Sequence, residues 1–394
     1  MRRFVPFLLI LFAIAAFLRV DFFFTIVYLF FGVYLLSRLW ARSIVERVDV
    51  ERRYASHAFL GDRVTVDVTL RNTGWLPVPW LEVHEALPVQ LIAPPFHREV
   101  ISLGPQEQRH LRYTLNCRRR GFYPIGPLTM QTGDLLGVER RSVAQAEPSY
   151  ITIYPRVVPL QGLGLPTRSP LVALPARAHL FEEPARVMGV RDYQPGDSPR
   201  RIHWTATASA GRVLVKQYQP AIARETLICL DLDQNSYERG QRYTATELAI
   251  VVAASIASHV VTREKLPAGL TTDAWDPLLK DRAHFLLPPR SERAHLMSIL
   301  EVLARVQVVS QAPFAELLRR ASVNLPWGAT LAVITGRESE ALFDTLVYLR
   351  RAGFAVALIL VQSGRSSVEL RQRSDLLSLP IRRVWHEHDL ETWR

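Results

Sequence analysis

One loop of the chain carries oxygen-bearing side chains at a spacing that suits a hard divalent cation. It follows the apolar run ETLICLDLD, residues 225–233. Its oxygen-bearing residues are Asp231, Asp233, Asn235 and Ser236. Mg²⁺ needs only one or two protein carboxylates together with water. We expect no cofactor, and the pattern makes Mg²⁺ the one candidate.

Two other interpretations of this loop stay open. Carboxylates at the end of a strand can cap the loop and helix that follow. The next strand end expected to lie beside the loop, Ile334–Arg337, offers a threonine and no acid. Its arginine, Arg337, could replace a cation by pairing with Asp231 or Asp233.

A second cluster of polar and aromatic residues lies in residues 189–219, GVRDYQPGDSPRRIHWTATASAGRVLVKQYQ. Its Pro-Gly pair predicts a tight turn. Asp197 is placed to cap a short helix that Gly211 ends, and a strand leading into the C-terminal domain follows. Two functions stay open for the segment. It is a clasp between domains, with Trp204 packed on a sheet and Asp197 and Arg200 tying the turn, or it is a docking surface for a partner.

Residue types that perform hydrolysis are present but not grouped. Cys229 lies in the middle of an apolar strand pattern, His203 has no evident nucleophile, and His386 and His388 have the pattern of an exposed pair. A Walker motif needs a Gly-Lys pair, and no lysine of the chain follows a glycine. The lysines are Lys216, Lys265 and Lys280. We therefore expect no enzyme, and a hydrolase is the least favoured alternative.

The chain is basic, with 48 lysines and arginines and a net charge of +11 over 394 residues. Such a charge is typical of proteins that bind nucleic acid or an anionic membrane surface. Arg118–Arg120, beside Phe122 and Tyr123, could grip a nucleic acid, but a basic run also protects the edge of a sheet. Because the arginines are dispersed, we expect no nucleic-acid binding, and anionic lipid explains the charge more simply.

Residues 1–42 predict an anchor that would position these groups at a membrane. Two apolar runs, Phe4–Leu18 and Phe22–Leu36, are separated only by RVD. Each is shorter than the ~20 residues of an upright span, but flanking arginines and Trp40 extend it. We predict a tight membrane hairpin; the alternative, a cleaved signal peptide, would leave the second apolar run at the N-terminus. Arginines on both outer flanks place the rest of the chain in the cytoplasm, at the inner membrane.

Two folded domains are expected after the anchor. In residues 43–150, RVTVDVTLRNTG and HLRYTLNC alternate apolar and polar side chains, and no helical stretch intervenes, which predicts an antiparallel Ig-like β-sandwich. Cys117 and Cys229 lie in apolar strand patterns as small buried hydrophobes. Residues 151–224 connect to residues 225–394, where strands and helices alternate. That alternation predicts a doubly wound α/β domain whose ligands bind beyond the strands' carboxyl ends.

The segment at 189–219 carries a further pattern, R-x-Y-x-x-G-D-x-x-R-x-I-x-W. Its members are Arg191, Tyr193, Gly196, Asp197, Arg200, Ile202 and Trp204. This pattern resembles the signature of the bacterial family called "domain of unknown function 58". The N-terminal hairpin and the runs at Arg119–Val138 and Ile153–Leu160 agree with the resemblance.

The resemblance implies a C-terminal domain like that of von Willebrand factor A, whose metal site carries D-x-S-x-S. Asp231, Asp233 and Asn235 (or Ser236) stand at those positions, and only Asp231 matches outright. The aspartate expected after the later strand is missing from residues 335–337.

The resemblance also implies partners and a role. It implies a membrane protein that works beside MoxR-type AAA+ ATPases and other membrane or von Willebrand A proteins. We therefore expect a membrane-anchored, non-enzymatic scaffold or adaptor that presents its α/β domain to such an ATPase. The alternative is a basic membrane protein that binds nucleic acid or anionic lipid.

Overall fold

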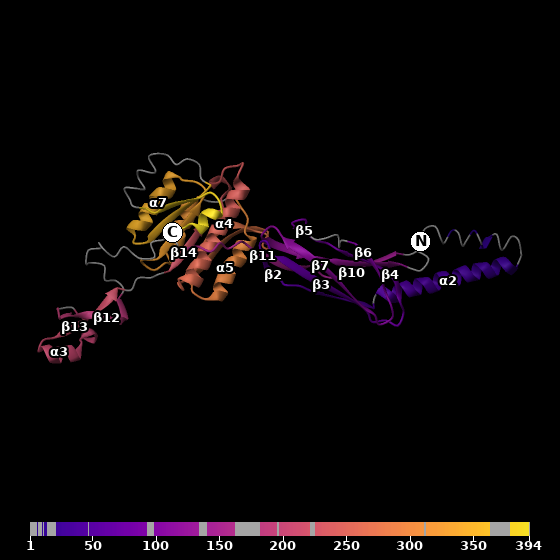
Figure 1. The fold of residues 1–394 in the computed structure, drawn as a ribbon, viewed down its shortest axis with the longest axis horizontal. Coiled ribbons are helices and arrows are strands. Elements are labelled where there is room, and N and C mark those ends of the chain that lie inside the picture. Colours follow the sequence, from indigo (N-terminus) through magenta and orange to yellow (C-terminus); the bar gives the residue numbers. More distant parts are fainter. Residues whose placement is uncertain are drawn as a thin grey trace. The chain divides into compact units, whose positions relative to one another are not determined.

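The computed structural model divides the chain into two compact units, Met1–Arg156 and Val157–Arg394 (Figure 1). The residues that it describes are 6, 10, 12–13, 21–45, 47–92, 98–133, 140–161, 182–194, 197–220, 225–310, 313–362 and 379–393. The first unit contains a long helix and eleven labelled strands, and the second contains an α/β domain together with a small hairpin.

The first unit begins with helix α2, Asp21–Val45. Its apolar stretch Phe24–Leu36 is shorter than a bilayer span. Among the described residues one helix is long and apolar enough to cross a membrane, Arg242–Arg263, but 83% of its apolar window is buried in the second unit. It is thus a core helix. The first predicted apolar run, Phe4–Leu18, lies almost wholly outside the described residues, so the hairpin stays a prediction.

Short strands form the rest of the first unit, as the alternating pattern predicts, and they pair antiparallel except for β2 with β11. They are β1 Val48–Arg53, β2 His57–Phe59, β3 Arg63–Asn72, β4 Val78–Glu85, β5 Leu91–Ile92, β6 Glu99–Leu103, β7 Gln108–Cys117, β8 Gly121–Ile125, β9 Leu128–Gly133, β10 Arg140–Ala146 and β11 Ser149–Tyr154. Two four-stranded sheets, ordered β1-β3-β7-β5 and β10-β9-β4-β6, bury their inner faces in one core. A third sheet, β2-β11-β8, extends the unit to residue 156, beyond the predicted end at residue 150.

A buried ion pair joins the two main sheets inside this core. Arg52 of β1 places its Nη2 atom 2.7 Å from Oε1 of Glu85 on β4, and both side chains are almost fully buried. The hydroxyl of Tyr113, on β7, donates a hydrogen bond of 2.5 Å to the same carboxylate. Arg52 also donates to the Ile125 carbonyl and the Ser149 hydroxyl. Three sheets thus converge on one guanidinium group.

The second unit holds a six-stranded sheet of order β16-β15-β14-β17-β18-β19. Its strands are β14 Thr226–Leu230, β15 Ala268–Asp276, β16 Asp281–Arg290, β17 Thr330–Thr335, β18 Ala355–Val361 and β19 Ile381–Val384. All neighbours are parallel except β15 and β16. The helices are α4 Arg242–Ser258, α5 Arg293–Arg305, α6 Phe314–Ser322, α7 Glu340–Arg351 and the short α9 His388–Glu391.

Helices cover both faces of this sheet, which confirms the doubly wound α/β architecture. Apolar residues of α6 and α7 pack against alternate side chains of β14, β17 and β18 in one core cluster. Helix α4 contacts the same three strands and α5, which in turn contacts β15 and the edge strand β16 (Figure 1). Helix α4 is buried along most of its length, since it is apolar all round.

A small hairpin lies between these domains in sequence. Strand β12, Glu182–Asp192, pairs antiparallel with β13, Leu214–Pro220. The predicted single helix is two pieces, a 3₁₀ turn at Pro199–Arg201 and helix α3 at Trp204–Ala210. The break has a physical cause: Ile202 adopts an extended conformation and forms a bridge with Val215 of β13.

Candidate functional site

The described residues 189–194 and 197–216 form a rigid unit, here called the signature module. Arg191 of β12 binds Asp197 through two hydrogen bonds, of 2.7 and 2.6 Å. The Asp197 carboxylate also accepts from the backbone N–H of Gln194 at 2.9 Å. The Arg191 guanidinium and this N–H hold the pKa of Asp197 below its usual range. A bidentate arginine–carboxylate pair fixes geometry as well as charge, so it closes the turn.

The turn differs from its prediction in two respects. Asp197 does not cap the helix; it binds Arg191 and the Gln194 N–H, whereas the residue that precedes the 3₁₀ turn is Ser198. Arg191, and not the predicted Arg200, ties the turn to the strand. Gly196, a member of the sequence pattern, lies outside the described residues.

Helix α3 is fastened to strand β13 by hydrogen bonds. His203 is its N-cap, and the ring Nδ1 accepts from the N–H of Ala206 at 3.2 Å. The His203 N–H donates to the Leu214 carbonyl at 2.8 Å, and the Leu214 N–H donates to Thr207 Oγ1 at 3.0 Å. Gly211 ends the helix with a φ of 66°, as predicted. His203 therefore has a capping role.

Several apolar side chains of the signature module face solvent, whereas Leu214 and Val215 of β13 are buried. Trp204 is 70% exposed, and Val190, Tyr193 and Val213 are each more than 40% exposed. Trp204 is thus largely uncovered within its own hairpin, and the clasp between domains stays a prediction. Because the backbone beneath these residues is fixed by an ion pair and a capped helix, their exposure favours a docking surface.

The acidic loop after β14 centres on Asp231, which is buried. Its Oδ1 accepts from the Asp233 N–H at 3.0 Å, and its Oδ2 accepts from the hydroxyl of Thr335, at the end of β17, at 2.8 Å. A hydrogen bond from the Ser236 side chain also reaches the Asp231 carboxylate. Burial nevertheless raises the pKa of Asp231 to about 6. The carboxylate thus connects the ends of two neighbouring strands.

Hydrogen bonds within the protein occupy this loop, and not the ion pair with Arg337 that was one of the open interpretations. In the described part of the chain, no ion pair joins Arg337 to Asp231 or Asp233. Asp233 accepts from the backbone N–H of Asn235, as a capping carboxylate does. Asn235 is exposed, and the Tyr237 hydroxyl donates to the Asp231 carbonyl at 2.6 Å.

The side chains around Asp231 do not make up a metal-ligand set. Among the residues that the structure describes, no three His, Cys, Asp or Glu side chains group closely enough to hold an ion. Both oxygens of Asp231 already accept hydrogen bonds from protein donors. The geometry favours the capping interpretation over a Mg²⁺ site.

Replacing Asp231 with asparagine is expected to change the pH dependence of stability. The folded-state pKa of Asp231, about 6, exceeds its ordinary value of 3.8, so wild type loses stability as pH rises between these values. The shift corresponds to a loss of about 2–3 kcal/mol in the free energy of unfolding of wild type. Asp231→Asn should not show this loss. Urea unfolding of both detergent-solubilised proteins at pH 4 and pH 7 measures the difference. Equal pH dependence in the two proteins would contradict the assignment.

Excess Mg²⁺ in the same unfolding experiment tests the loop for a metal. A cation bound through Asp231 would stabilise wild type and leave Asp231→Asn unchanged. We expect neither protein to shift.

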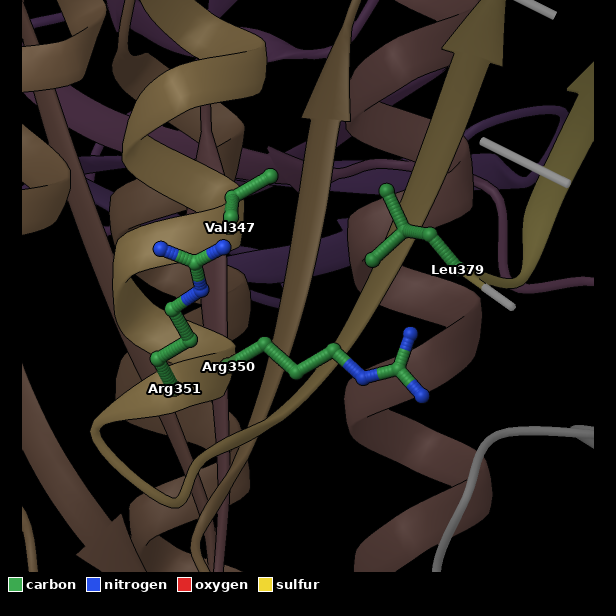
Figure 2. A pocket seen from close by; sticks show the side chains of 4 residues that line it. All are labelled: Val347, Arg350, Arg351 and Leu379. Atoms are coloured by element: carbon green, nitrogen blue, oxygen red, sulfur yellow. The ribbon is translucent and has the colours of Figure 1, made fainter. Parts of the chain in front are cut away.

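A cavity of about 270 Å³ lies elsewhere in the second unit, at the end of α7. Figure 2 shows its lining side chains, Val347, Arg350 and Arg351 of α7 and Leu379 before β19. The polar groups of these lining residues are two guanidinium groups. They can attract an anion, but these four residues include no acid and no nucleophile.

Sequence comparison finds a family match over the signature module and part of the α/β domain. Residues 189–323 match the family described as "Protein of unknown function DUF58". The match begins within β12 and covers the whole signature module. The match confirms the resemblance to this family that the sequence pattern predicted.

A relative supports the assignment over more of the chain. "Uncharacterized protein YeaD" of Bacillus subtilis (strain 168) is 23% identical over 335 residues, which cover 80% of this chain and 76% of that protein.

Solved structures resemble about a quarter of the chain. The CARDB domain of the PF1109 protein from Pyrococcus furiosus is 19% identical, with 27% of this chain and 91% of that chain covered and a TM-score of 0.20. A cohesin module from Clostridium perfringens is 12% identical, with coverage of 27% and 96% and a TM-score of 0.22. At these TM-scores the likenesses carry no functional argument.

Proposed function

We propose that the chain is a membrane-anchored, non-enzymatic scaffold that holds a cytoplasmic MoxR-type AAA+ ATPase through its signature module. The observation that carries the proposal is the exposed Trp204 on a backbone held by the Arg191–Asp197 pair. Tryptophan, tyrosine and arginine dominate the binding energy of protein interfaces. A side chain presented by an ordered backbone also loses little entropy on binding.

Charge next to Trp204 suits an acidic partner surface. Arg200, Arg201, Arg212 and Lys216 lie in the same module as two acids, Asp192 and Asp197. Asp197 is neutralised by Arg191 and Asp192 contacts Arg212. The module is therefore net positive, which would speed encounter with an acidic surface of the ATPase.

The anchor in this proposal is the N-terminal hairpin. Along α2, apolar side chains such as Tyr28, Leu29 and Leu36 are about two-thirds exposed, as lipid-facing residues would be. Phe12 is helical, and the centroid of its ring lies 6.2 Å from the centroid of the Phe24 ring. That contact supports two antiparallel helices. With arginines on both flanks, the soluble domains would face the cytoplasm at the inner membrane.

The second unit would act as a von Willebrand A-like domain toward the ATPase and its client complexes. Support comes from the α/β sheet, whose first parallel strand, β14, ends at the acidic loop of Asp231. Ligands of such sheets bind at the carboxyl ends of the strands. The hydrogen-bonded loop would contact a partner directly, without a metal ion between them.

Nucleic acid is a less favoured partner on structural grounds. Arg118–Arg120 directly precede β8, which is the edge strand of its three-stranded sheet. Phe122 stacks on Tyr150 at 4.6 Å between ring centroids, so one of its faces already has a partner. The basic run thus has the position of a charged strand edge.

Affinity capture of the full-length chain from detergent-solubilised membranes tests the proposal. An AAA+ ATPase should be recovered with wild type and identified by mass spectrometry. A control capture uses the unrelated exposed-tryptophan variant Trp385→Ala and should recover the same ATPase. Recovery of other proteins without any AAA+ ATPase would refute the proposed partner.

A further inference from the structure

A structured turn at one end of the β-sandwich holds an exposed tryptophan. The turn comprises residues 72–77 and is here called the Trp75 turn. Asn72 is buried beneath it and donates hydrogen bonds of 2.8 Å to the carbonyls of Leu76 and Gly104. The same side chain accepts from the Gly74 N–H at 2.9 Å. Trp75 itself is 72% exposed.

The Trp75 turn is joined to the end of α2. The N–H and the hydroxyl of Thr73 both donate to the carbonyl of Arg47, each at 2.8 Å. The indole N–H of Trp40 donates to the Pro77 carbonyl at 3.3 Å. Trp40 also packs against the sandwich core. The turn is thereby fixed to Trp40 of α2 and to Arg47, which follows the helix.

Helix length places this part of the chain at the level of lipid headgroups. An α-helix rises ~1.5 Å per residue, so the stretch from Asp21 to Trp40 is about 30 Å long, the thickness of the hydrocarbon core. The headgroup layer adds about 5–8 Å on each side. A turn attached at Trp40 and at Arg47 therefore spans that layer. Tryptophan is enriched at this depth, where its ring is in lipid and its N–H is in water.

The surrounding residues suit an anionic interface. Arg38 and Arg42 lie in the last turns of α2, and Arg47 follows it. Arg71, at the end of β3, adjoins the turn and is exposed. Basic residues at a cytoplasmic membrane surface each contribute about 1 kcal/mol of attraction to anionic lipid.

We infer that the Trp75 turn is a second membrane contact, through which the β-sandwich sits on the headgroup layer of an anionic bilayer. This inference rests on the proposed anchoring of α2 in the membrane. Trp75 enters the interface beside Trp40, and the hydrogen bonds of Asn72 and Thr73 hold it there. The sandwich is therefore held at the bilayer surface by Trp75 as well as by α2, and it does not swing freely on the helix.

Nitroxide labels at three positions of the reconstituted full-length chain test the inference. The variants are Trp75→Cys, Leu29→Cys and Val89→Cys, each in vesicles of phosphatidylcholine with phosphatidylglycerol. Leu29 is 66% exposed on α2 and Val89 is 91% exposed. Val89 follows β4, which starts just after the Trp75 turn and runs ~25 Å away from it. The native cysteines, Cys117 and Cys229, are buried and should not react.

Collision of the label with oxygen, which concentrates in lipid, is compared with collision with a water-soluble nickel chelate. We expect the ratio of oxygen to nickel collision in Trp75→Cys to exceed that in Val89→Cys severalfold and to lie below that in Leu29→Cys. Equal ratios in Trp75→Cys and Val89→Cys, with the Leu29→Cys label in hydrocarbon, would overturn the inference while leaving the anchor intact. A Leu29→Cys label that is open to nickel would refute the anchor, and the inference with it.

Discussion

Replacing Glu85 with alanine should destabilise the β-sandwich by about 3–5 kcal/mol. The substitution leaves the guanidinium of Arg52 buried beside no carboxylate, and it removes the acceptor of the Tyr113 hydroxyl. Removing one partner of a buried ion pair is costly, because the remaining charge stays out of water. The expected loss is a large share of the roughly 5–15 kcal/mol by which domains are usually stable. Urea unfolding of the detergent-solubilised chain, followed by circular dichroism, measures it.

An exposed ion pair in the same sheets supplies the control. Arg112 on β7 and Asp67 on β3 lie opposite one another, with Nε of Arg112 2.6 Å from Oδ1 of Asp67. Both side chains are substantially exposed. Asp67→Ala should cost less than about 1 kcal/mol, since water screens such pairs. Similar losses for Glu85→Ala and Asp67→Ala would show that the buried pair does not hold the sheets together.

Replacing Trp204 with alanine should weaken partner binding by about 2 kcal/mol or more, or roughly 30-fold, because exposed tryptophans on ordered backbones are typical binding hot spots. The melting temperature should stay within about 1 °C of wild type, since the side chain is 70% exposed and buries little apolar surface. Thermal unfolding and a binding titration on the same preparation separate these effects. A large fall in melting temperature with unchanged binding would support the clasp interpretation and contradict the docking surface.

Most of the second unit's architecture could be predicted from sequence, because its strands are buried on both faces and therefore apolar throughout. The predicted alternation of strands and helices over residues 225–394 corresponds to strands β14, β15, β17 and β18 and to helices α4–α7. The edge strands β16 and β19 were not predicted. In an edge strand, apolar residues alternate with polar ones, so the continuous apolar run is missing. In β16 every second residue is exposed.

The exposure of Trp204 within its hairpin could not be predicted for a different reason. A tryptophan in a compact motif is more often buried, and sequence cannot distinguish a buried aromatic from one that a rigid turn presents to solvent. The pairing of Asp197 with Arg191 was equally hidden, because it depends on how β12 enters the turn. Glycine and proline positions predicted the turns, and the spacing of Asp197 suggested a cap.

The structure of the acidic loop was likewise predictable only in part. The sequence predicted that Asp231 lies at the end of one strand and that Thr335 lies at the end of the neighbouring strand. It did not predict that the Thr335 hydroxyl donates directly to Asp231, nor that Tyr237 closes the loop. Gly336 offered a signal for this closure. A β-carbon at that position would lie 2.6 Å from the Ser236 carbonyl oxygen, so the two loops touch.

Binding of the captured AAA+ ATPase to the purified full-length chain, measured for wild type, Trp204→Ala and Trp385→Ala, tests the central claim most directly. Trp385 lies in the α/β domain and is 44% exposed, so its variant controls for the loss of any exposed tryptophan. The scaffold account predicts equal affinity for wild type and Trp385→Ala and a loss of roughly 30-fold for Trp204→Ala. Equal affinity for all three proteins would contradict it.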